Sequence, residues 1–319
     1  MEAVKLEAMN WVKHKDREAW LEERERGIGA SEAAAVLDAS PWMTPLQLYA
    51  HKVGQAPKAD LAAENEAMEW GLSLEGPVLA RWERETKRKL VTIPKPASVW
   101  AKDILDSEGK PFILATPDGI AEWPDGELGM VEVKTTGGYG FKPWESGEAP
   151  VHYEIQLQQQ LLVSGLRHGS FALLVDGRKF FYLDRERDDA FIGDTLIPAL
   201  RAFRERIIRR DPPPPTGKEG ERQAVSALWP NQTERAIELG SDVGQIDDEL
   251  EDLKAKAKEL ESEIEKRKSQ IMLVLGDSEA GILPSGVRYT FKKVNRAGYT
   301  VEPKEFRELR RLKAKGGKE

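Results

Sequence analysis

Residues 1–210 combine two periodicities of hydrophobic and polar positions, one typical of helices and the other of strands. Two positions carry helix-start signals: Ser31, which precedes a Glu and a run of alanines, and Thr44, which precedes a proline. Helices are expected over residues 31–37, from residue 44, over 64–89 with an interruption at Gly76-Pro77, over 151–164, and up to Arg210. Strands are expected over residues 90–93, 112–116, 129–135, 170–175 and 179–183.

A proline run gives the clearest boundary in the chain. The segment DPPPPTG at residues 211–217 cannot continue a helix and forms a stiff, extended spacer. Residues 1–210 therefore form one predicted unit. Its helices come first, a run of strands follows, and a helix stands between two later strands, which is an α/β pattern.

Residues 218–319 follow a different pattern. From Ile246 to Val274 the apolar residues are spaced by alternating steps of four and three, interrupted at Arg267, with Glu and Lys between them. This is a heptad stripe with solvated flanks. Residues 287–292 alternate strictly, which predicts a half-buried strand. We expect a helical hairpin or coiled coil followed by a small β element, with no role assigned.

Composition removes several classes of protein. The chain has no Cys and four His, so disulfide frameworks, thiolate zinc sites, iron–sulfur clusters and a cysteine nucleophile are excluded and a His-rich metal site is disfavoured. The longest apolar runs are far too short for a membrane span, and the N-terminus has mixed charge, unlike a signal peptide. The expected location is the cytoplasm of a bacterial or phage-infected cell.

The motif with chemical meaning lies in residues 115–136. Asp118 follows a proline at the end of one strand, and the next strand carries Glu132, Val133 and Lys134. Side chains alternate faces along a strand, so Glu132 and Lys134 share one face and converge with Asp118 on a hairpin edge. Hard divalent cations bind such oxygens, and phosphodiester hydrolysis needs a cation. An exposed hairpin with a surface salt bridge is the alternative interpretation.

This string resembles the core signature of the restriction-endonuclease-like nuclease superfamily, in which Pro-Asp is followed, after a gap, by Asp/Glu-x-Lys. Pro117-Asp118 and Glu132-Val133-Lys134 occupy its positions. Three further blocks resemble the phage-type recombination exonucleases, the lambda exonuclease and YqaJ group, in the same order: residues 27–54, 67–83 and 151–165. The resemblance implies a restriction-endonuclease-like core, with a mixed central sheet flanked by helices.

The resemblance also implies the roles of the site residues. It assigns Asp118, Glu132 and the Val133 carbonyl to the metal, Glu75 to the metal directly or through water, Lys134 to catalysis, and Gln156 to support of Lys134. The implied cofactor is Mg²⁺, with two ions and with Mn²⁺ as a substitute.

Two of these assignments have plain structural alternatives. Glu75 also fits a helix-surface carboxylate beside Arg81 or Arg84. Gln156 also fits a polar helix face, because three more glutamines follow at residues 158–160, and Gln158 is a second candidate for its role.

A second site follows from the same resemblance. Helix N-termini suit a phosphate, and Ser31 begins a predicted helix. In the resembled family an Arg, this Ser and a hydroxyl residue before Pro-Asp form a pocket for the terminal 5′ phosphate; Arg24 or Arg26 and Thr116 take these places. Met68 lies near the family's apolar residue that separates the terminal base pairs, and a buried helix methionine is the alternative.

The function implied is a Mg²⁺-dependent deoxyribonuclease that degrades linear double-stranded DNA 5′ to 3′ and leaves a 3′ single strand for an annealing protein or recombinase. The lambda exonuclease resemblance implies a ring of three subunits. The alternatives are another endonuclease or repair nuclease of the same superfamily, and a non-catalytic protein that binds DNA ends or acts as a scaffold.

The net charge of −7 argues at first against a nucleic-acid partner. The charge is unevenly distributed, however, because the last 32 residues, 288–319, hold 11 basic and 4 acidic side chains, a net charge of +7. Further basic clusters lie at residues 81–89 and 201–210. We expect the basic tail and these clusters to hold the phosphates.

Overall fold

The computed structural model describes residues 9–55, 66–233 and 235–295, apart from the side chains of Ala67 and Met68. The chain divides into two units, Met1–Pro230 and Asn231–Glu319. In the first unit the α-helices are α2 (Arg17–Glu25), α3 (Ala33–Val36), α4 (Pro45–Lys52), α6 (Glu66–Thr86), α7 (Lys142–Glu145), α8 (Val151–Ser164), α9 (Asp189–Phe191), α10 (Ile197–Arg209) and α11 (Glu221–Leu228). Shorter helical turns are η1 (Ala30–Glu32), η2 (Gly138–Phe141) and the π-type η3 (Ile192–Leu196).

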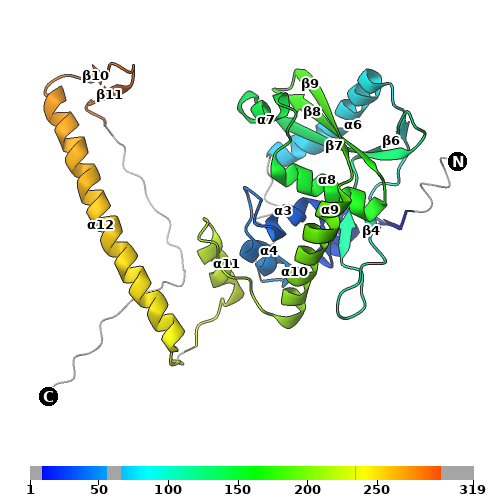
Figure 1. Cartoon of the computed structure of the whole chain (residues 1–319), viewed down its shortest axis with the longest axis horizontal. Helices are drawn as coiled ribbons and strands as arrows, with labels where there is room; N and C mark the ends of the chain where they lie inside the picture. The colour runs from blue at the N-terminus through cyan, green and yellow to red at the C-terminus, as the bar shows by residue number, and fades with distance from the viewer. Residues whose placement is uncertain (1–8, 56–65, 234, 296–319) are drawn as a thin grey trace. The chain divides into compact units, whose positions relative to one another are not determined.

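The strands of this unit form two sheets (Figure 1). A five-stranded sheet has the order β3-β6-β7-β8-β9, and a four-stranded sheet has the order β1-β4-β5-β2. The strands of the first are β3 (Leu90–Val91), β6 (Gly119–Glu122), β7 (Leu128–Thr136), β8 (His168–Val175) and β9 (Lys179–Glu186). Those of the second are β1 (Trp11–Lys13), β4 (Ala97–Trp100), β5 (Ile113–Ala115) and β2 (Ile28–Gly29).

The five-stranded sheet is mixed and is flanked by helices, as the sequence predicts. Neighbouring strands are antiparallel except β7 and β8, which are parallel and are joined through α8. Helix α6 packs on one face, where Trp82 contacts the cluster that includes Val131 and Ala172. Helix α8 covers the other face, where Leu157 and Leu161 join the main core. The site therefore lies on a strand that is buried from both sides.

Helix α8 also joins the two sheets through a buried amide. The Gln159 Nε2 donates to the carbonyl oxygens of Ile28 at 2.8 Å and Leu114 at 3.0 Å, which belong to β2 and β5. These two strands pair in parallel. These two hydrogen bonds fix the start of η1 and α3, and thereby Ser31, relative to α8, the helix that covers β7.

Two helices of the first unit differ from the sequence prediction. Helix α6 continues through Gly76-Pro77, with Pro77 inside it, because Val78 and Trp82 beyond the proline are buried against the sheet and this packing outweighs the local preference. Ser31 does not cap a regular helix; it lies in the short η1 turn that precedes α3. The cap at Thr44 is confirmed, with a capping box between Thr44 and Gln47.

The boundary between the units falls after the expected spacer. The proline run at residues 211–217 is followed by α11, which packs on α4 in the first unit through Ala224, Leu46 and Ala50. Glu221 is buried there and accepts hydrogen bonds from the Thr216 and Gly217 amides. The described chain therefore divides at Pro230 rather than within residues 211–217.

The described part of the second unit contains one long helix; of the two expectations, a helical hairpin and a coiled coil, the hairpin is the one that the structure does not show. Helix α12 (Ser241–Leu275) runs without a break for 35 residues, and the hairpin β10 (Ala280–Ile282) and β11 (Arg288–Thr290) follows it. Strand β11 is fully exposed, against the prediction of a half-buried strand, because no described element covers either face. No helix among the described residues is long and apolar enough to cross a membrane.

A single buried hydrogen bond ties α6 to the sheet and provides a test of this packing. The indole Nε1 of Trp82 donates to the Ser170 hydroxyl at 2.9 Å, and both residues are fully buried. Ser170→Ala leaves that donor unsatisfied, so we expect a loss of about 1–3 kcal/mol in the free energy of unfolding. Urea denaturation measures this loss. Ser73→Ala, at an exposed position of the same helix, is the control and should change stability by less than about 0.5 kcal/mol.

Candidate active site

The β6–β7 hairpin brings the predicted acids together. Asp118 directly precedes β6, and Gly119 pairs with Val131 on β7. The backbone N–H of Val133 donates to Asp118 Oδ2 at 2.8 Å. Asp118 is thus fixed beside β7, the strand that carries Glu132. The turn between β6 and β7 lies between the two predicted motif segments.

Glu132 is a buried carboxylate with three donors. Its side chain points from β7 towards α8 and the residue is 2% exposed. Oε1 accepts from Lys134 Nζ at 2.6 Å and Gln156 Nε2 at 2.5 Å, and Oε2 accepts from Gln160 Nε2 at 2.6 Å. Because Gln156 and Gln160 are four residues apart on α8, both amides reach the same carboxylate. The buried charge is therefore paired and hydrogen-bonded.

Lys134 lies in the same network as a cation. Its Nζ also donates to Gln156 Oε1 at 3.0 Å and lies 4.6 Å from the centre of the Tyr153 ring. Burial by itself lowers the pKa of Lys134, but the carboxylates of Glu132 and Asp118 outweigh burial, and the pKa is raised above its ordinary value. In this arrangement Lys134 carries a positive charge rather than acting as a base.

At Asp118, unlike at Lys134, the surroundings disfavour the charged form of the side chain. Burial raises the pKa of Asp118 well above its ordinary value, and the negative charges of Glu132 and Glu75 raise it further, more than Lys134 and the Val133 N–H lower it. Three carboxylates thus influence one another across the site. A bound cation would remove this repulsion.

Glu75 contacts a lysine that the sequence analysis did not single out. The Nζ of Lys95 forms an ion pair with Glu75 Oε1 and donates to the Asp118 backbone carbonyl at 2.9 Å. Neither Arg81, which pairs with Glu85, nor any other described arginine is the recorded partner of Glu75. Lys95 lies in the loop between β3 and β4, where no periodicity or motif marks it.

The three acids Glu75, Asp118 and Glu132 and the lysine Lys134 line one side of a pocket of about 450 Å³. Its other side is aromatic: Trp42 packs edge-on against His152, with ring centres 4.7 Å apart, and Tyr153 adjoins both. Burial and the charge of Lys134 lower the pKa of His152, so its ring is neutral at neutral pH. No motif in the sequence marks Trp42 or His152, because their approach depends on the folded loop after α3.

The oxygen donors of the site are of the kind that a hard divalent cation prefers, although Glu75 and Glu132 form ion pairs with lysines. Asp118, Glu132 and the Val133 carbonyl supply oxygens, which Mg²⁺ and Mn²⁺ prefer. Among the described residues, no three Asp, Glu or His side chains are grouped closely enough to enclose an ion as they stand. Lys95 and Lys134 are paired with two of the three acids. The site would therefore bind a cation by exchange with these ammonium groups.

The residues predicted for a 5′ phosphate also lie together. Arg24 Nη2 donates to the Ser31 hydroxyl at 3.0 Å, and the guanidinium lies 4.8 Å from the Trp20 ring. The Trp20 Nε1 donates to the Thr116 hydroxyl at 3.1 Å. Ser31 lines the same pocket as Asp118. Trp20 links the arginine to the hydroxyl residue, and the sequence analysis missed it.

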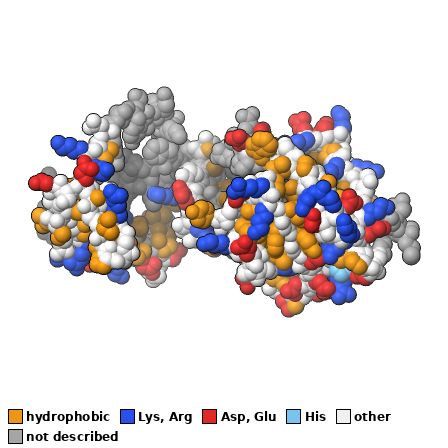
Figure 2. All heavy atoms as spheres, turned by 90° about the horizontal axis from the view of Figure 1, so that it is seen from above, with side chains coloured by type: hydrophobic (Ala, Val, Ile, Leu, Met, Phe, Trp, Pro, Cys, Tyr) orange, Lys and Arg blue, Asp and Glu red, His pale blue; other side chains and the backbone are white. Residues whose placement is uncertain are grey.

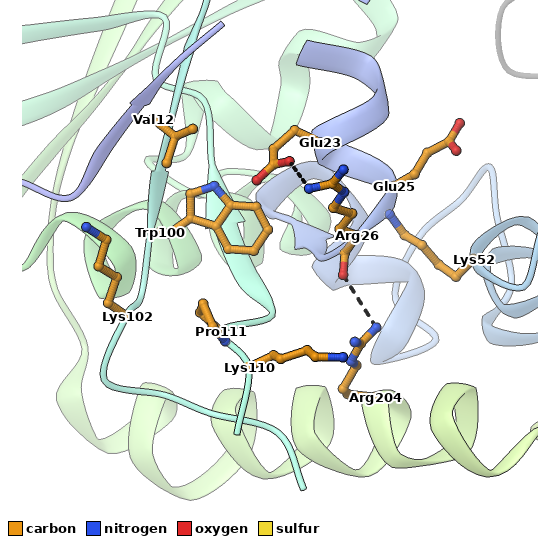
Figure 3. A pocket seen from close by; sticks show the side chains of 10 residues that line it. All are labelled: Val12, Glu23, Glu25, Arg26, Lys52, Trp100, Lys102, Lys110, Pro111 and Arg204. Carbon is orange, nitrogen blue, oxygen red and sulfur yellow. Dashed lines mark hydrogen bonds and ion pairs between the residues drawn. The ribbon is translucent and has the colours of Figure 1, made fainter. Parts of the chain in front are cut away.

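Arg26 points to a different place. It lines a separate pocket of about 480 Å³ (Figure 3), where it pairs with Glu23 at 3.0 Å and its backbone carbonyl accepts from Arg204 at 3.4 Å. Of the two candidates, Arg24 is therefore the one beside Ser31. Arg24 lies in the last turn of α2, and Arg26 is the residue that caps the helix.

Two other predicted residues lie outside the site. Gln158 is buried, donates to the Glu186 carbonyl at 2.9 Å and accepts from the Asp188 N–H at 2.8 Å, so its role is structural. Met68 belongs to α6, and its side chain lies outside the described residues.

The fold and the site define an α/β protein whose mixed sheet is flanked by helices and carries a cluster of acids and a lysine. The profile of the YqaJ-like viral recombinase domain matches residues 19–167. The protein YqaJ of Bacillus subtilis (strain 168) is 30% identical over 258 residues, which cover 78% of this chain and 77% of YqaJ. The chain therefore belongs to the YqaJ-like viral recombinase domain family.

Two solved structures are similar in fold. An alkaline exonuclease from Laribacter hongkongensis matches with a TM-score of 0.47 and 23% identity, over 61% of this chain and 94% of that one. A phage-related exonuclease from Haemophilus somnus 129PT matches with a TM-score of 0.37 and 12% identity, over 58% and 96%.

The raised pKa of Asp118 predicts a pH-dependent stability. Folded Asp118 holds its proton more tightly than unfolded Asp118, so its contribution to stability is full below about pH 4 and is lost as the pH rises through the raised value. Asp118→Asn removes this loss and can still accept from Val133 N–H. In EDTA we expect a higher Tm than the unsubstituted protein at pH 7 and no difference below about pH 4. Asp103→Asn, at an exposed position, should show no such trend.

Proposed function

We propose that this chain is a Mg²⁺-dependent deoxyribonuclease that digests linear double-stranded DNA from its 5′ ends and leaves 3′ single strands for recombination by strand annealing. The observation that carries the proposal is the cluster of Asp118, Lys134 and the buried Glu132 in the pocket that also contains Ser31 of the candidate end-binding site. Membership of a viral recombinase domain family supports it.

Each residue of the cluster has a defined task in this proposal. Asp118, Glu132 and the Val133 carbonyl would hold two Mg²⁺ ions, or Mn²⁺, with Glu75 after its exchange from Lys95. When bound, such ions activate water and neutralise charge on the phosphate. Lys134, kept protonated by its carboxylate neighbours, donates to a phosphate oxygen as charge develops. Gln156 holds the Lys134 ammonium in place.

The end specificity comes from Arg24. A guanidinium over a Trp ring, with a Ser hydroxyl at 3.0 Å, is held in one orientation and presents its remaining N–H groups to a terminal phosphate. Because Ser31 and Asp118 line one pocket, a 5′ phosphate bound at Arg24 would put a nearby phosphodiester within reach of the acids. The family resemblance adds to the proposal a ring of three subunits and an annealing protein as partner.

The phosphates of the duplex beyond the end also need cations. In the basic cluster at residues 81–89, Arg88 is held by a bidentate pair with Asp184 at 2.8 and 2.6 Å. In the cluster at residues 201–210, Arg204 pairs with Asp106 and Arg206 with Asp211. In the view of Figure 2, acidic and basic side chains are interspersed over the first unit. The predicted basic tail from residue 296 onward lies outside the described residues.

The catalytic assignment is tested with two DNA substrates. In Mg²⁺ we expect 5′-phosphorylated linear duplex to be degraded and closed circular plasmid to remain intact. Lys134→Ala should lower kcat by about 10²–10³-fold through the lost charge stabilisation, and Glu132→Ala should abolish hydrolysis. Lys13→Ala, at an exposed position of β1, is the control. Cutting of the circle indicates an endonuclease; absence of hydrolysis in both Mg²⁺ and Mn²⁺, or full activity in Glu132→Ala, contradicts the assignment.

The end-binding assignment is tested by comparing two arginines. Arg24→Ala should lower kcat/KM for 5′-phosphorylated duplex by about 10- to 150-fold, the equivalent of one or two charge-assisted hydrogen bonds, and should leave 5′-hydroxyl duplex nearly unchanged. Arg26→Ala is the matched control, because its guanidinium faces the other pocket. An equal loss on both kinds of end, or a larger loss in Arg26→Ala, contradicts the role of Arg24.

A further inference from the structure

Helix α12 exposes an apolar stripe that has no cover among the described residues. None of its 35 residues is buried. Ile246, Leu253, Leu260 and Ile264 are each between 52% and 64% exposed. Hydrophobic side chains are also visible on the surface of the second unit in Figure 2. Helices in water are stabilised mainly by packing of such a face, so we expect the apolar face of α12 to pack against another helix.

The spacing of the stripe defines coiled-coil positions. The alternating steps of four and three assign Leu250, Ala257, Ile264 and Ile271 to position a, and Ile246, Leu253, Leu260, Arg267 and Val274 to position d. Nine consecutive core positions are thus set, and eight of them are apolar. Arg267 is the exception; it pairs with Glu263 of its own helix at 3.4 Å and remains exposed.

The charges beside the stripe identify the partner as another copy of the same helix. In a parallel coiled coil, each g residue faces the e residue five positions further along the other helix. These pairs are Glu249 with Lys254, Lys256 with Glu261, and Glu263 with Lys268. All three are of opposite charge, in both directions across the seam. The acidic pair Asp242 with Asp247 is at the start of the helix, in its first two turns, where negative charge is favourable.

The side chains concerned are free to make these pairs. In the single chain Lys254 pairs with Glu251 at 2.8 Å and Lys268 with Glu265 at 2.7 Å, and all four side chains are largely exposed. Such exposed pairs contribute little and exchange readily. We propose that α12 is a parallel coiled-coil seam through which copies of this chain associate by their second units.

A single cysteine detects the seam and its direction. The chain has no Cys, so Ile246→Cys introduces a unique thiol at a d position. In a parallel coil the two thiols face each other and form an intermolecular disulfide under mild oxidation. In an antiparallel coil, where the a positions of one helix face the d positions of the other, they lie roughly 40 Å apart, at 1.5 Å per residue, and Ile246→Cys would instead cross-link to Ile271→Cys. That second result would overturn the proposal.

Charge reversal in the full-length Ile246→Cys protein tests the pairing itself. Reversal of the e positions (Lys254→Glu, Glu261→Lys, Lys268→Glu) or of the g positions (Glu249→Lys, Lys256→Glu, Glu263→Lys) makes every pair in a homomer repulsive. We expect each set alone to reduce the disulfide-linked species about tenfold or more. A mixture of the two sets restores all the pairs and should restore the cross-link.

The matched control for the e set carries the same change in net charge away from the seam, as Lys258→Glu, Glu259→Lys and Lys266→Glu, and should keep the cross-link. Recovery in the mixture also shows that both variants fold. No cross-link in the parent Ile246→Cys protein, an equal loss in the control, or no recovery in the mixture overturns the proposal.

Discussion

The buried negative charge of Glu132 is the constraint on which the rest of this site depends. A carboxylate that is 2% exposed would cost several kcal/mol if it were unpaired, and it lies between a strand and a helix that are both in the core. Its donors come from Gln156 and Gln160 on α8 and from Lys134 on β7. Satisfying that charge therefore fixes the rotation of α8 about its axis. The same helix then positions Gln159, whose amide holds β2 and β5.

The negative charge of Asp118 is less well compensated than that of Glu132, and in the proposed nuclease this repulsion would favour the entry of a cation. Asp118 is buried between the carboxylates of Glu132 and Glu75, which is why its pKa is raised. Lys95 pairs with Glu75 and Lys134 with Glu132, whereas among the described residues the donor to the Asp118 carboxylate is the Val133 backbone N–H. A site that binds divalent cations must keep acids close enough to repel one another before the cation enters. In the proposed nuclease, the destabilisation of Asp118 would be the counterpart of its affinity for a cation.

The sequence predicted those features that local rules determine. Helix α8 begins and ends where its pattern does, and strand alternation correctly placed Glu132 and Lys134 on one face, with Val131 on the other. What it could not predict depends on contacts between distant segments. Lys95 reaches the site from a loop, and the choice of Arg24 over Arg26 depends on the turn after α2. The four glutamines on α8 have different partners. Which of them reaches the site depends on which face of the helix packs on β7 and which on β2.

The overall acidity of the chain can be understood from how its arginines are paired. Arg88, Arg204 and Arg206 each pair with an acid of the first unit, so their charges serve to hold elements together. Arg24 differs, because among the described residues its recorded side-chain contacts are a hydroxyl and an aromatic ring rather than an ion pair. A net charge of −7 is therefore compatible with an anionic substrate. Binding requires a local cation at the point of contact, and Arg24 would supply one beside the candidate active-site pocket.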